Sequence, residues 1–138
     1  MGLIYVDACL LIYAFEHHPR HGDAVRKLFA RAQPGSMAIS PLVQLECLVG
    51  PMKTGNLVLQ NYYEEGLRQL VNLPLPEAVF LQAARARAQF GLKTPDAIHL
   101  AVAQYHRCSA LWTNDDRLAQ AAYGLAVNVL DQRDAVPS

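Results

Sequence analysis

Short apolar segments alternate with longer helical segments along nearly the whole chain, and this alternation constrains the fold most. The first segment, LIYV at residues 3–6, stops at Asp7 and is followed by ACLLIYAFE, which is long and apolar enough for a buried helix. Further short strands are expected over residues 37–40, 71–75, 110–112 and 126–130. This order predicts an α/β fold with three layers: a central, mainly parallel sheet of short strands, flanked by helices.

Proline and glycine mark the expected helix boundaries. The helix after residue 40 is expected to end at Gly50 and Pro51, because proline lacks the amide hydrogen that a helix interior needs. A later helix is expected to begin at Thr94, which can cap it, with Pro95 at its first position. Other helices are expected over residues 57–70 and 76–90.

The length and composition indicate one globular domain. The chain has 138 residues, of which 52% are hydrophobic, so residues 1–138 are expected to form a single domain with a frayed tail from about residue 131. The formal net charge is +0, which neither indicates nor excludes a nucleic-acid partner, because binding requires only a local basic patch.

The cysteines and the apolar runs indicate a cytoplasmic protein. Cys9, Cys47 and Cys108 are widely spaced, odd in number and set among apolar residues, which is typical of small core residues in a reducing compartment. The first residues lack the pattern of a signal peptide, and no run reaches the roughly 18 apolar residues of a membrane span. No membrane partner is therefore expected.

Two acidic residues directly follow expected strands. Asp7 ends the first strand, and Asp115 follows the segment ALW after Thr113 and Asn114. In an open parallel sheet, ligands bind at the carboxyl ends of the strands. Capping of the next helix explains the position of Asp7 equally well. Asp116 is interpreted as a first-turn acid that complements the dipole of its helix.

Glu46 lies inside an apolar helical segment, PLVQLECLVG. The only other polar side chain between Pro41 and Val49 is Gln44, which lies about 200° away around the helix. A carboxylate in such surroundings must be neutralised, paired or bound to a metal, and no cationic residue occurs within one turn. The alternative is an acid that reaches solvent along the edge of the helix.

Asp96 heads another apolar helical segment, KTPDAIHLAVAQ. By itself it is explained as a first-turn acid that favours the helix dipole. Together with the three other unusual acids it would form a convergent negative pocket. Carboxylates forced together raise one another's pKa, a cost that a divalent cation removes, and an all-oxygen ligand set favours Mg²⁺ or Mn²⁺ over zinc.

Four segments in this order resemble the motifs of PIN-domain ribonucleases, and among these the VapC-type toxins of toxin–antitoxin pairs. They are YVDACLLIYAFE, ISPLVQLECLVG, LKTPDAIHLAVAQ and LWTNDDRLAQAA, and the third is the most specific. The resemblance extends from Leu3 to about Leu130. It implies a PIN-like fold, a homodimer, a small cognate antitoxin, and Mg²⁺- or Mn²⁺-dependent endoribonuclease activity that hydrolyses RNA phosphodiester bonds. The catalytic and metal-binding quartet that it implies is Asp7, Glu46, Asp96 and Asp115.

Two further positions match supporting residues of the family, and two depart from its pattern. Ser40 matches the hydroxyl residue that opens the second motif, and Thr113 matches the one that precedes the fourth acid by two positions. Ala8 and Cys9 stand where the family usually has small polar residues, so the hydrogen bonding around Asp7 is expected to be weaker or differently supplied.

Three residues near the acids are candidates for contacts with substrate. Lys93 and Arg117 are candidates for phosphate contacts, and His99, one turn after Asp96, is a candidate to orient that residue or to touch substrate. Two alternatives to a ribonuclease remain open at this point. One is a catalytically impaired binding module with the same fold, and the other is a different metal-dependent phosphohydrolase, such as a DNA nuclease.

Overall fold

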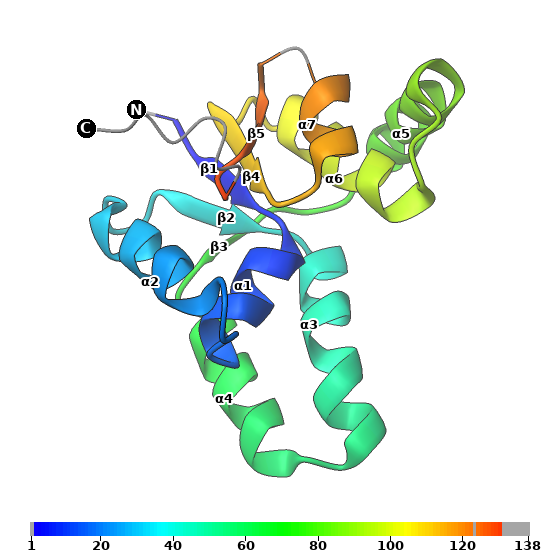
Figure 1. Cartoon of the computed structure of the whole chain (residues 1–138). Coiled ribbons are helices and arrows are strands. Elements are labelled where there is room, and N and C mark those ends of the chain that lie inside the picture. The colour runs from blue at the N-terminus through cyan, green and yellow to red at the C-terminus, as the bar shows by residue number, and fades with distance from the viewer. Residues whose placement is uncertain (1, 123, 131–138) are drawn as a thin grey trace, which may run out of the picture.

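A five-stranded parallel sheet forms the centre of the computed structural model, which describes residues 2–122 and 124–130 (Figure 1). The spatial order of the strands is β3-β2-β1-β4-β5, and each neighbouring pair is parallel. The expected α/β fold is thus confirmed, while the tail expected from about residue 131 lies outside the described residues. The strands are β1 (Ile4–Val6), β2 (Met37–Ile39), β3 (Val71–Asn72), β4 (Ala110–Thr113) and β5 (Ala126–Asn128).

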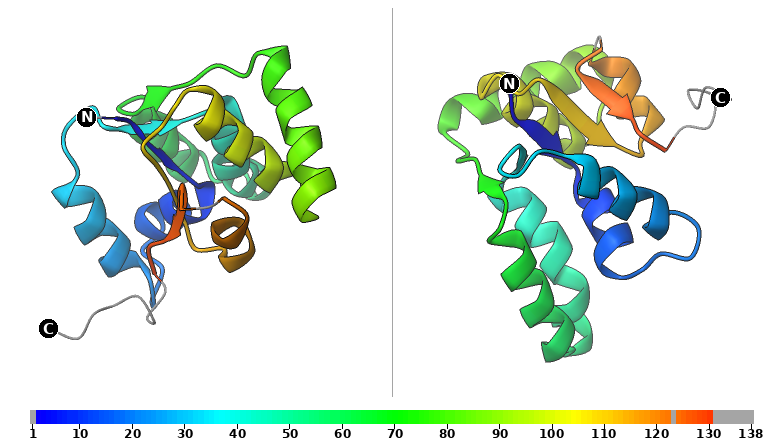
Figure 2. Two further views of the ribbon diagram at one scale, coloured as in Figure 1. Left: turned by 90° about the horizontal axis from the view of Figure 1, so that it is seen from above. Right: turned by 90° about the vertical axis from the view of Figure 1, so that its left-hand side faces the viewer.

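Helices cover both faces of the sheet. Helices α1 to α4 lie on one face and α5 to α7 on the other (Figure 2). This division follows from the strand order, because right-handed crossovers that reverse direction along the sheet must switch faces. The helices of the described residues are α1 (Ala8–Phe15), α2 (Gly22–Arg31), α3 (Pro41–Thr54), α4 (Leu57–Leu67), α5 (Glu77–Phe90), α6 (Thr94–Tyr105) and α7 (Asp116–Ala121).

The core lies between the sheet and these two helical layers. Tyr5 and Val6 of β1 and Leu111 of β4 are fully buried, as are Leu100 and Val102 of α6. Strands covered on both faces need apolar side chains on both faces, which explains why the strand segments read as continuous apolar runs. Because β1 is the central strand, Asp7, which directly follows it, lies in the middle of the row of carboxyl ends of the strands.

The strand order reverses between β1 and β4. The chain adds β2 and β3 on one side of β1, and then returns to add β4 and β5 on the other side. The connections therefore leave in opposite directions at the carboxyl ends of β1 and β4, which is where open α/β sheets form ligand-binding crevices.

The expected break at Gly50 and Pro51 is wrong, because α3 continues through both residues to Thr54. Pro51 cannot donate a helical hydrogen bond, but its side chain is buried, so packing offsets this loss. The helix ends instead at Gly55, whose φ of 67° is a left-handed conformation that glycine adopts easily.

Two other helix boundaries also differ from expectation. Helix α4 ends at Leu67 rather than at residue 70. Helix α6 has Lys93 as its N-cap residue, whereas Thr94 is already its first helical residue. The Thr94 hydroxyl does not cap the helix but accepts a hydrogen bond from the Arg87 guanidinium of α5 at 2.9 Å. Among the described residues, no helix has the length and apolar character that crossing a membrane requires.

Candidate functional site

Asp7 and Thr113 meet at the carboxyl ends of β1 and β4. The Asp7 amide donates to the Trp112 carbonyl at 2.9 Å, which extends the pairing of the two strands by one residue. The Thr113 hydroxyl donates to Asp7 Oδ2 at 2.8 Å. Asp7 occupies the N-cap position of α1, but its side chain makes no capping hydrogen bond. Helix capping therefore does not explain this largely buried carboxylate.

Asp115 joins the same group through Thr113. Its amide donates to the Thr113 hydroxyl oxygen at 3.0 Å, so this hydroxyl links the two acidic residues. One carboxylate oxygen, Oδ1, caps α7 by accepting from the amides of Arg117 at 2.8 Å and Leu118 at 3.2 Å. Asp115 thus caps a helix and also lies beside Asp7. Asp116 accepts a hydrogen bond from the Asn128 amide group at 2.7 Å.

Glu46 reaches the same sheet edge from α3 and pairs with a histidine of α6. Its Oε1 lies 2.6 Å from Nε2 of His99, and its side chain is 29% exposed. Burial alone would lower the pKa of His99, but its hydrogen bond to Glu46 and the charges of Asp7, Glu46 and Asp96 raise it overall. The partner that an acid in an apolar helix requires is therefore supplied by a distant segment of the chain.

Asp96 lies in the first turn of α6 and lines the same pocket as the other three acids. Burial raises the pKa of its carboxyl group, and the charges of Asp115 and Asp7 raise it further. His99 acts in the opposite direction. The expected mutual effect of crowded carboxylates is therefore present at this residue, since nearby negative charges disfavour its ionised form.

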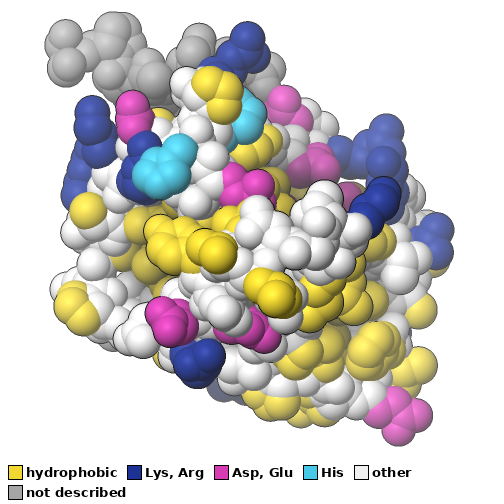
Figure 3. Space-filling view, turned by 90° about the horizontal axis from the view of Figure 1, so that it is seen from below, with side chains coloured by type: hydrophobic (Ala, Val, Ile, Leu, Met, Phe, Trp, Pro, Cys, Tyr) yellow, Lys and Arg dark blue, Asp and Glu magenta, His cyan; other side chains and the backbone are white. Residues whose placement is uncertain are grey.

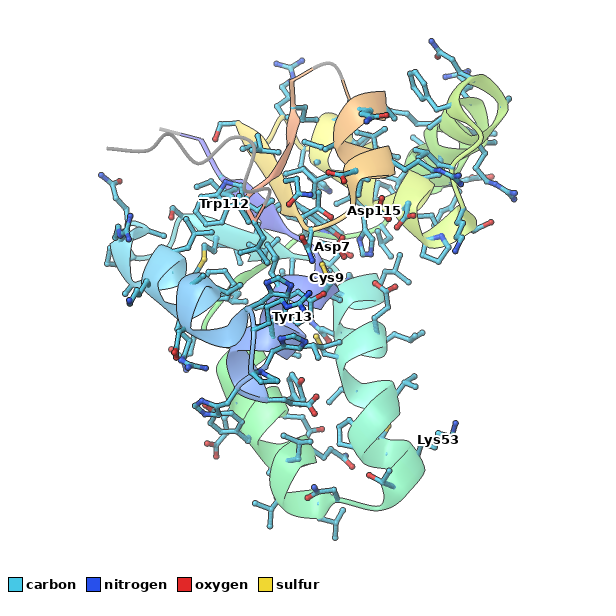
Figure 4. The ribbon with its side chains drawn as sticks, viewed as in Figure 1. Asp7, Cys9, Tyr13, Lys53, Trp112 and Asp115 are labelled. Carbon is cyan, nitrogen blue, oxygen red and sulfur yellow. The ribbon has the colours of Figure 1, made fainter. Side chains whose placement is uncertain are left out.

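These four acids line one open pocket of about 770 Å³ at the reversal point of the sheet. In Figure 4, Asp7 and Asp115 lie together with Cys9 and Tyr13, whereas Lys53 lies at the far end of α3. The sequence predicted these four acids, but it assigned Asp116 to the helix dipole and not to the pocket that this residue also lines. It did not predict the apolar part of the wall, since side chains such as Ile12 and Tyr13 resemble ordinary core positions. The lining residues are Asp7, Ala8, Cys9, Ile12, Tyr13, Leu45, Glu46, Val49, Asp96, Asn114, Asp115 and Asp116.

Oxygen ligands dominate this pocket, and a divalent metal fits the donor set. Ligand atoms of Asp7, Glu46 and His99 lie within 4.8 Å of one another. Asp96 and Asp115 add two further carboxylates to the lining of the same pocket. Burial, and then the charge of Asp7, raise the pKa of Cys9 to about 12, so its thiol stays protonated and is a poor ligand at neutral pH.

The supporting residues differ in their surroundings. Ser40 is fully buried, and its hydroxyl lies 2.8 Å from the Tyr5 hydroxyl rather than capping α3. His99 is also fully buried, so the expected contact with substrate is replaced by hydrogen bonds to Glu46 and Tyr5. Lys93 and Arg117 are exposed and do not line the pocket, although each is close in sequence to one of its acids.

The chain belongs to the PIN domain family. A family model of the PIN domain matches residues 4–123, which is most of the sequence. A search among curated proteins finds no match to the chain. The resemblance carried by the four sequence motifs is thereby confirmed at the level of the family.

Solved structures with this fold include toxins and toxin–antitoxin complexes. A toxin–antitoxin complex from Klebsiella pneumoniae is 24% identical with a TM-score of 0.77, covering 91% of this chain and 97% of that chain. VapC20 from Mycobacterium tuberculosis, a toxin that cleaves the sarcin–ricin loop, is 15% identical with a TM-score of 0.73, covering 86% and 94%. VapBC2 from Rickettsia felis, bound to a DNA fragment from its promoter, is 17% identical with a TM-score of 0.72, covering 91% and 97%. At these identities the similarity shows a shared fold.

Proposed function

We propose that this chain is a Mg²⁺- or Mn²⁺-dependent endoribonuclease and the toxin of a VapBC-type toxin–antitoxin pair. The observation that carries this proposal is the convergence of Asp7, Glu46, Asp96 and Asp115 on one open pocket. The raised pKa of Asp96 supports it, because a site that crowds carboxylates together is unfavourable without a cation. Membership of the PIN family and the toxin-like fold agree with this role.

The quartet would hold the metal mainly through carboxylate oxygens, which are the ligands that Mg²⁺ and Mn²⁺ prefer. A divalent cation at such a site lowers the pKa of an attacking water and polarises the scissile phosphate. Thr113 keeps Asp7 oriented toward the pocket, and capping of α7 fixes Asp115. Lys93 and Arg117 are exposed and available for contacts with RNA phosphates.

The departures at Ala8 and Cys9 do not remove the support of Asp7. Neither residue offers the polar side chain that the family usually has there, but the Thr113 hydroxyl donates to Asp7 from the neighbouring strand. This bond favours an active enzyme over an impaired binding module. The choice of RNA over DNA comes from the family and from a relative that cleaves the sarcin–ricin loop.

The proposed partners are a second copy of the chain and a small antitoxin, in the cytoplasm. Three cysteines without a disulfide agree with a reducing compartment. Helices α3 and α4 form a hairpin that projects from the sheet (Figure 1), and hydrophobic side chains cover much of the face seen from that end (Figure 3). The most exposed of these include Leu45, Val49, Met52, Leu57, Val58 and Tyr62. We assign this hairpin to the contact between two copies.

The substrate class is tested by offering the purified protein total RNA, single-stranded DNA, double-stranded DNA and nucleotides, each with Mg²⁺, Mn²⁺ or EDTA. Metal-dependent cutting of RNA alone is the expected result. Cutting of DNA or hydrolysis of nucleotides would indicate another metal-dependent phosphohydrolase. Tight binding of RNA without any cleavage or metal binding would identify the chain as an impaired binding module.

A further inference from the structure

A continuous chain of hydrogen bonds runs beneath the floor of the pocket and ends at Glu46. The Ser40 hydroxyl lies 2.8 Å from the Tyr5 hydroxyl, which lies 2.7 Å from Nδ1 of His99. The other ring nitrogen, Nε2, lies 2.6 Å from Glu46 Oε1. This chain therefore joins β1, the start of α3, and α6, three elements that are distant in sequence.

The members of this chain are buried to different degrees. Tyr5, Ser40 and His99 are fully buried, whereas the Glu46 side chain keeps 29% of its surface exposed and lines the pocket. No buried side-chain nitrogen or oxygen of the described residues lacks a hydrogen-bond partner. A satisfied buried network restricts the side chains to one arrangement, because every alternative would leave a polar group unpaired.

Chemistry fixes the direction of the hydrogen bond between His99 and Glu46. The ionised Glu46 carboxylate can only accept, so Nε2 of His99 must carry the hydrogen and donate it. Nδ1 pairs with the Tyr5 hydroxyl, accepting from it when the ring is neutral and donating to it when the ring is charged. The Tyr5 and Ser40 hydroxyls can each donate or accept, so their hydrogen bond forms in both cases. Ser40 and Tyr5 thus hold the ring in the orientation that aims Nε2 at Glu46.

His99 serves Glu46 rather than the neighbouring Asp7. The distance from Nε2 to Asp7 Oδ1 is 3.9 Å, which is too long for a hydrogen bond. Asp7 has its own donor in Thr113, the last residue of β4. Each of these two carboxylates is therefore held by a separate group, and within residues 2–122 and 124–130 the hydrogen-bond partner of Glu46 is the ring.

Packing by itself does not require this arrangement. Well-packed apolar side chains of similar volume often stabilise a core as well as buried polar groups do. Glu46 approaches the pocket from α3 and has no cationic side chain within one turn of its own helix. Without the ring, its carboxylate would be free to turn along the helix edge toward solvent. The network therefore keeps the Glu46 carboxylate at the pocket, which packing by itself would not do.

We propose that His99 is a positioning residue for Glu46, and that Tyr5 and Ser40 hold its imidazole for this task. The inference rests on the proposed metal-dependent nuclease function. One oxygen of Glu46 is occupied by the ring, which leaves the other to be presented to a metal. His99 acts through Glu46 and does not itself bind the metal. Partners of this kind typically change metal affinity by about 10- to 100-fold when they are removed.

The test is to titrate the purified protein with Mn²⁺ and to monitor binding by calorimetry and by electron paramagnetic resonance. Thermal unfolding in EDTA shows whether each variant is folded. We expect His99→Leu to raise the Kd for Mn²⁺ about 10- to 100-fold. His99→Gln keeps an amide that can donate to Glu46, so its Kd should lie closer to wild type. Tyr5→Phe removes only the hydroxyl and should raise the Kd about two- to tenfold.

A matched control lies at the other end of the same helix. His106 is the C-cap residue of α6, and its Nε2 lies 2.8 Å from the Pro74 carbonyl oxygen. His106→Leu removes a histidine and a hydrogen bond in the same way, but far along α6 from the pocket. It should leave the Kd for Mn²⁺ unchanged even if it lowers the unfolding temperature.

The outcomes separate the inference from the function on which it rests. If wild type binds Mn²⁺ and folded His99→Leu binds it equally well, His99 is merely structural and the inference is wrong. Nitrogen hyperfine coupling to bound Mn²⁺ that disappears in His99→Gln would also overturn it, because His99 would then be a ligand. If wild type binds no Mn²⁺ at millimolar concentration, the proposed nuclease function fails, and the role of His99 fails with it.

Discussion

At the residue scale, Asp96 shows how one carboxyl group can both begin a helix and belong to a site. It lies in the first turn of α6, where an acid favours the helix dipole, and it also lines the pocket. Its pKa is raised first by burial and then by the charges of Asp115 and Asp7. A dipole role alone would lower the pKa, so the raised pKa reflects first the burial of this carboxyl group and then the crowding of the acids.

This crowding predicts a pH-dependent cost to stability in the absence of metal. The folded protein holds the Asp96 proton more tightly than the unfolded chain does, where the pKa has its ordinary value of 3.8. The contribution of Asp96 is therefore favourable below pH 3.8 and is lost as the pH rises through the raised pKa. At pH 7 in EDTA, Asp96→Asn should unfold at the same temperature as wild type or higher. Differential scanning fluorimetry at several pH values provides the measurement.

A bound divalent metal should make wild type more stable than Asp96→Asn. At a Mg²⁺ concentration ten times the Kd, binding stabilises the folded protein by about 1.4 kcal/mol, which corresponds to roughly 3–6 °C for a chain of this size. We expect this shift for wild type and little or none for Asp96→Asn. Equal shifts in the two proteins would mean that Asp96 contributes nothing to metal binding.

The sequence revealed the acids of the site because each breaks a local pattern. Asp7 and Asp115 interrupt the passage from strand to helix, and Glu46 interrupts an apolar helix. The bond between Glu46 and His99 could not be predicted, because it joins residues 53 positions apart across two helices. A single histidine in the apolar segment after Asp96 was the only signal that such a partner existed.

At the element scale, local signals located the helices but misplaced some of their ends. The Gly50–Pro51 pair is typical of a helix end, yet α3 continues because Pro51 is buried against the rest of the molecule. At the end of α6 nearest the pocket, the hydroxyl of Thr94 accepts a hydrogen bond from Arg87 of α5 and does not cap the helix. Both differences arise from tertiary contacts, which propensities along the chain do not contain.

The packing of α4 on α1 depends on a glycine. A Cβ atom at Gly66 would lie 2.6 Å from Cε2 and Cζ of Phe15, and this ring is stacked on Tyr63 with 5.0 Å between the centroids. Gly66→Ala should therefore destabilise the protein, because overpacking costs about 1–3 kcal/mol and exceeds the gain of about 0.5–1 kcal/mol in helix propensity. Urea unfolding measures the difference.

Gly50 provides the control for this prediction. It lies within α3, and a Cβ atom there would have no neighbour within 4 Å. Gly50→Ala should gain about 0.5–1 kcal/mol of stability, because only the propensity term remains. Stabilisation by both substitutions would show that the Phe15 ring moves aside at little cost.

At the scale of the whole molecule, the strand order brings the acids together. The alternation of strands and helices predicted a parallel sheet. Because the carboxyl ends of parallel strands lie at the same end of a sheet, this predicted that Asp7 and Asp115 lie at one end together. The order β3-β2-β1-β4-β5 makes β1 and β4 neighbours, and this adjacency does not follow from the sequence pattern alone. The adjacency of β1 and β4 is what brings these acids to one pocket.

The proposed dimer is also a property of the whole molecule. Val58, at the tip of the α3–α4 hairpin, is 83% exposed and is one of several exposed apolar residues on these two helices, and an apolar patch of this kind is typical of a protein–protein interface. We expect wild type to have twice the mass of the chain in multi-angle light scattering, and Val58→Asp to shift it toward the monomer. Leu81→Asp changes an apolar residue on α5 that is 61% exposed and should leave the mass unchanged. A monomeric wild type would contradict the prediction.

The most direct test of the proposed function is cleavage of total RNA by wild type, Asp96→Asn and Glu77→Gln, each with Mg²⁺, Mn²⁺ or EDTA. Glu77→Gln removes a first-turn carboxylate from α5, outside the pocket, and so controls for charge and helix dipole. We predict that wild type and Glu77→Gln cut only with metal, and that folded Asp96→Asn with metal cuts no faster than wild type in EDTA. Equal cutting by Asp96→Asn and wild type would contradict a catalytic metal site at these four carboxylates.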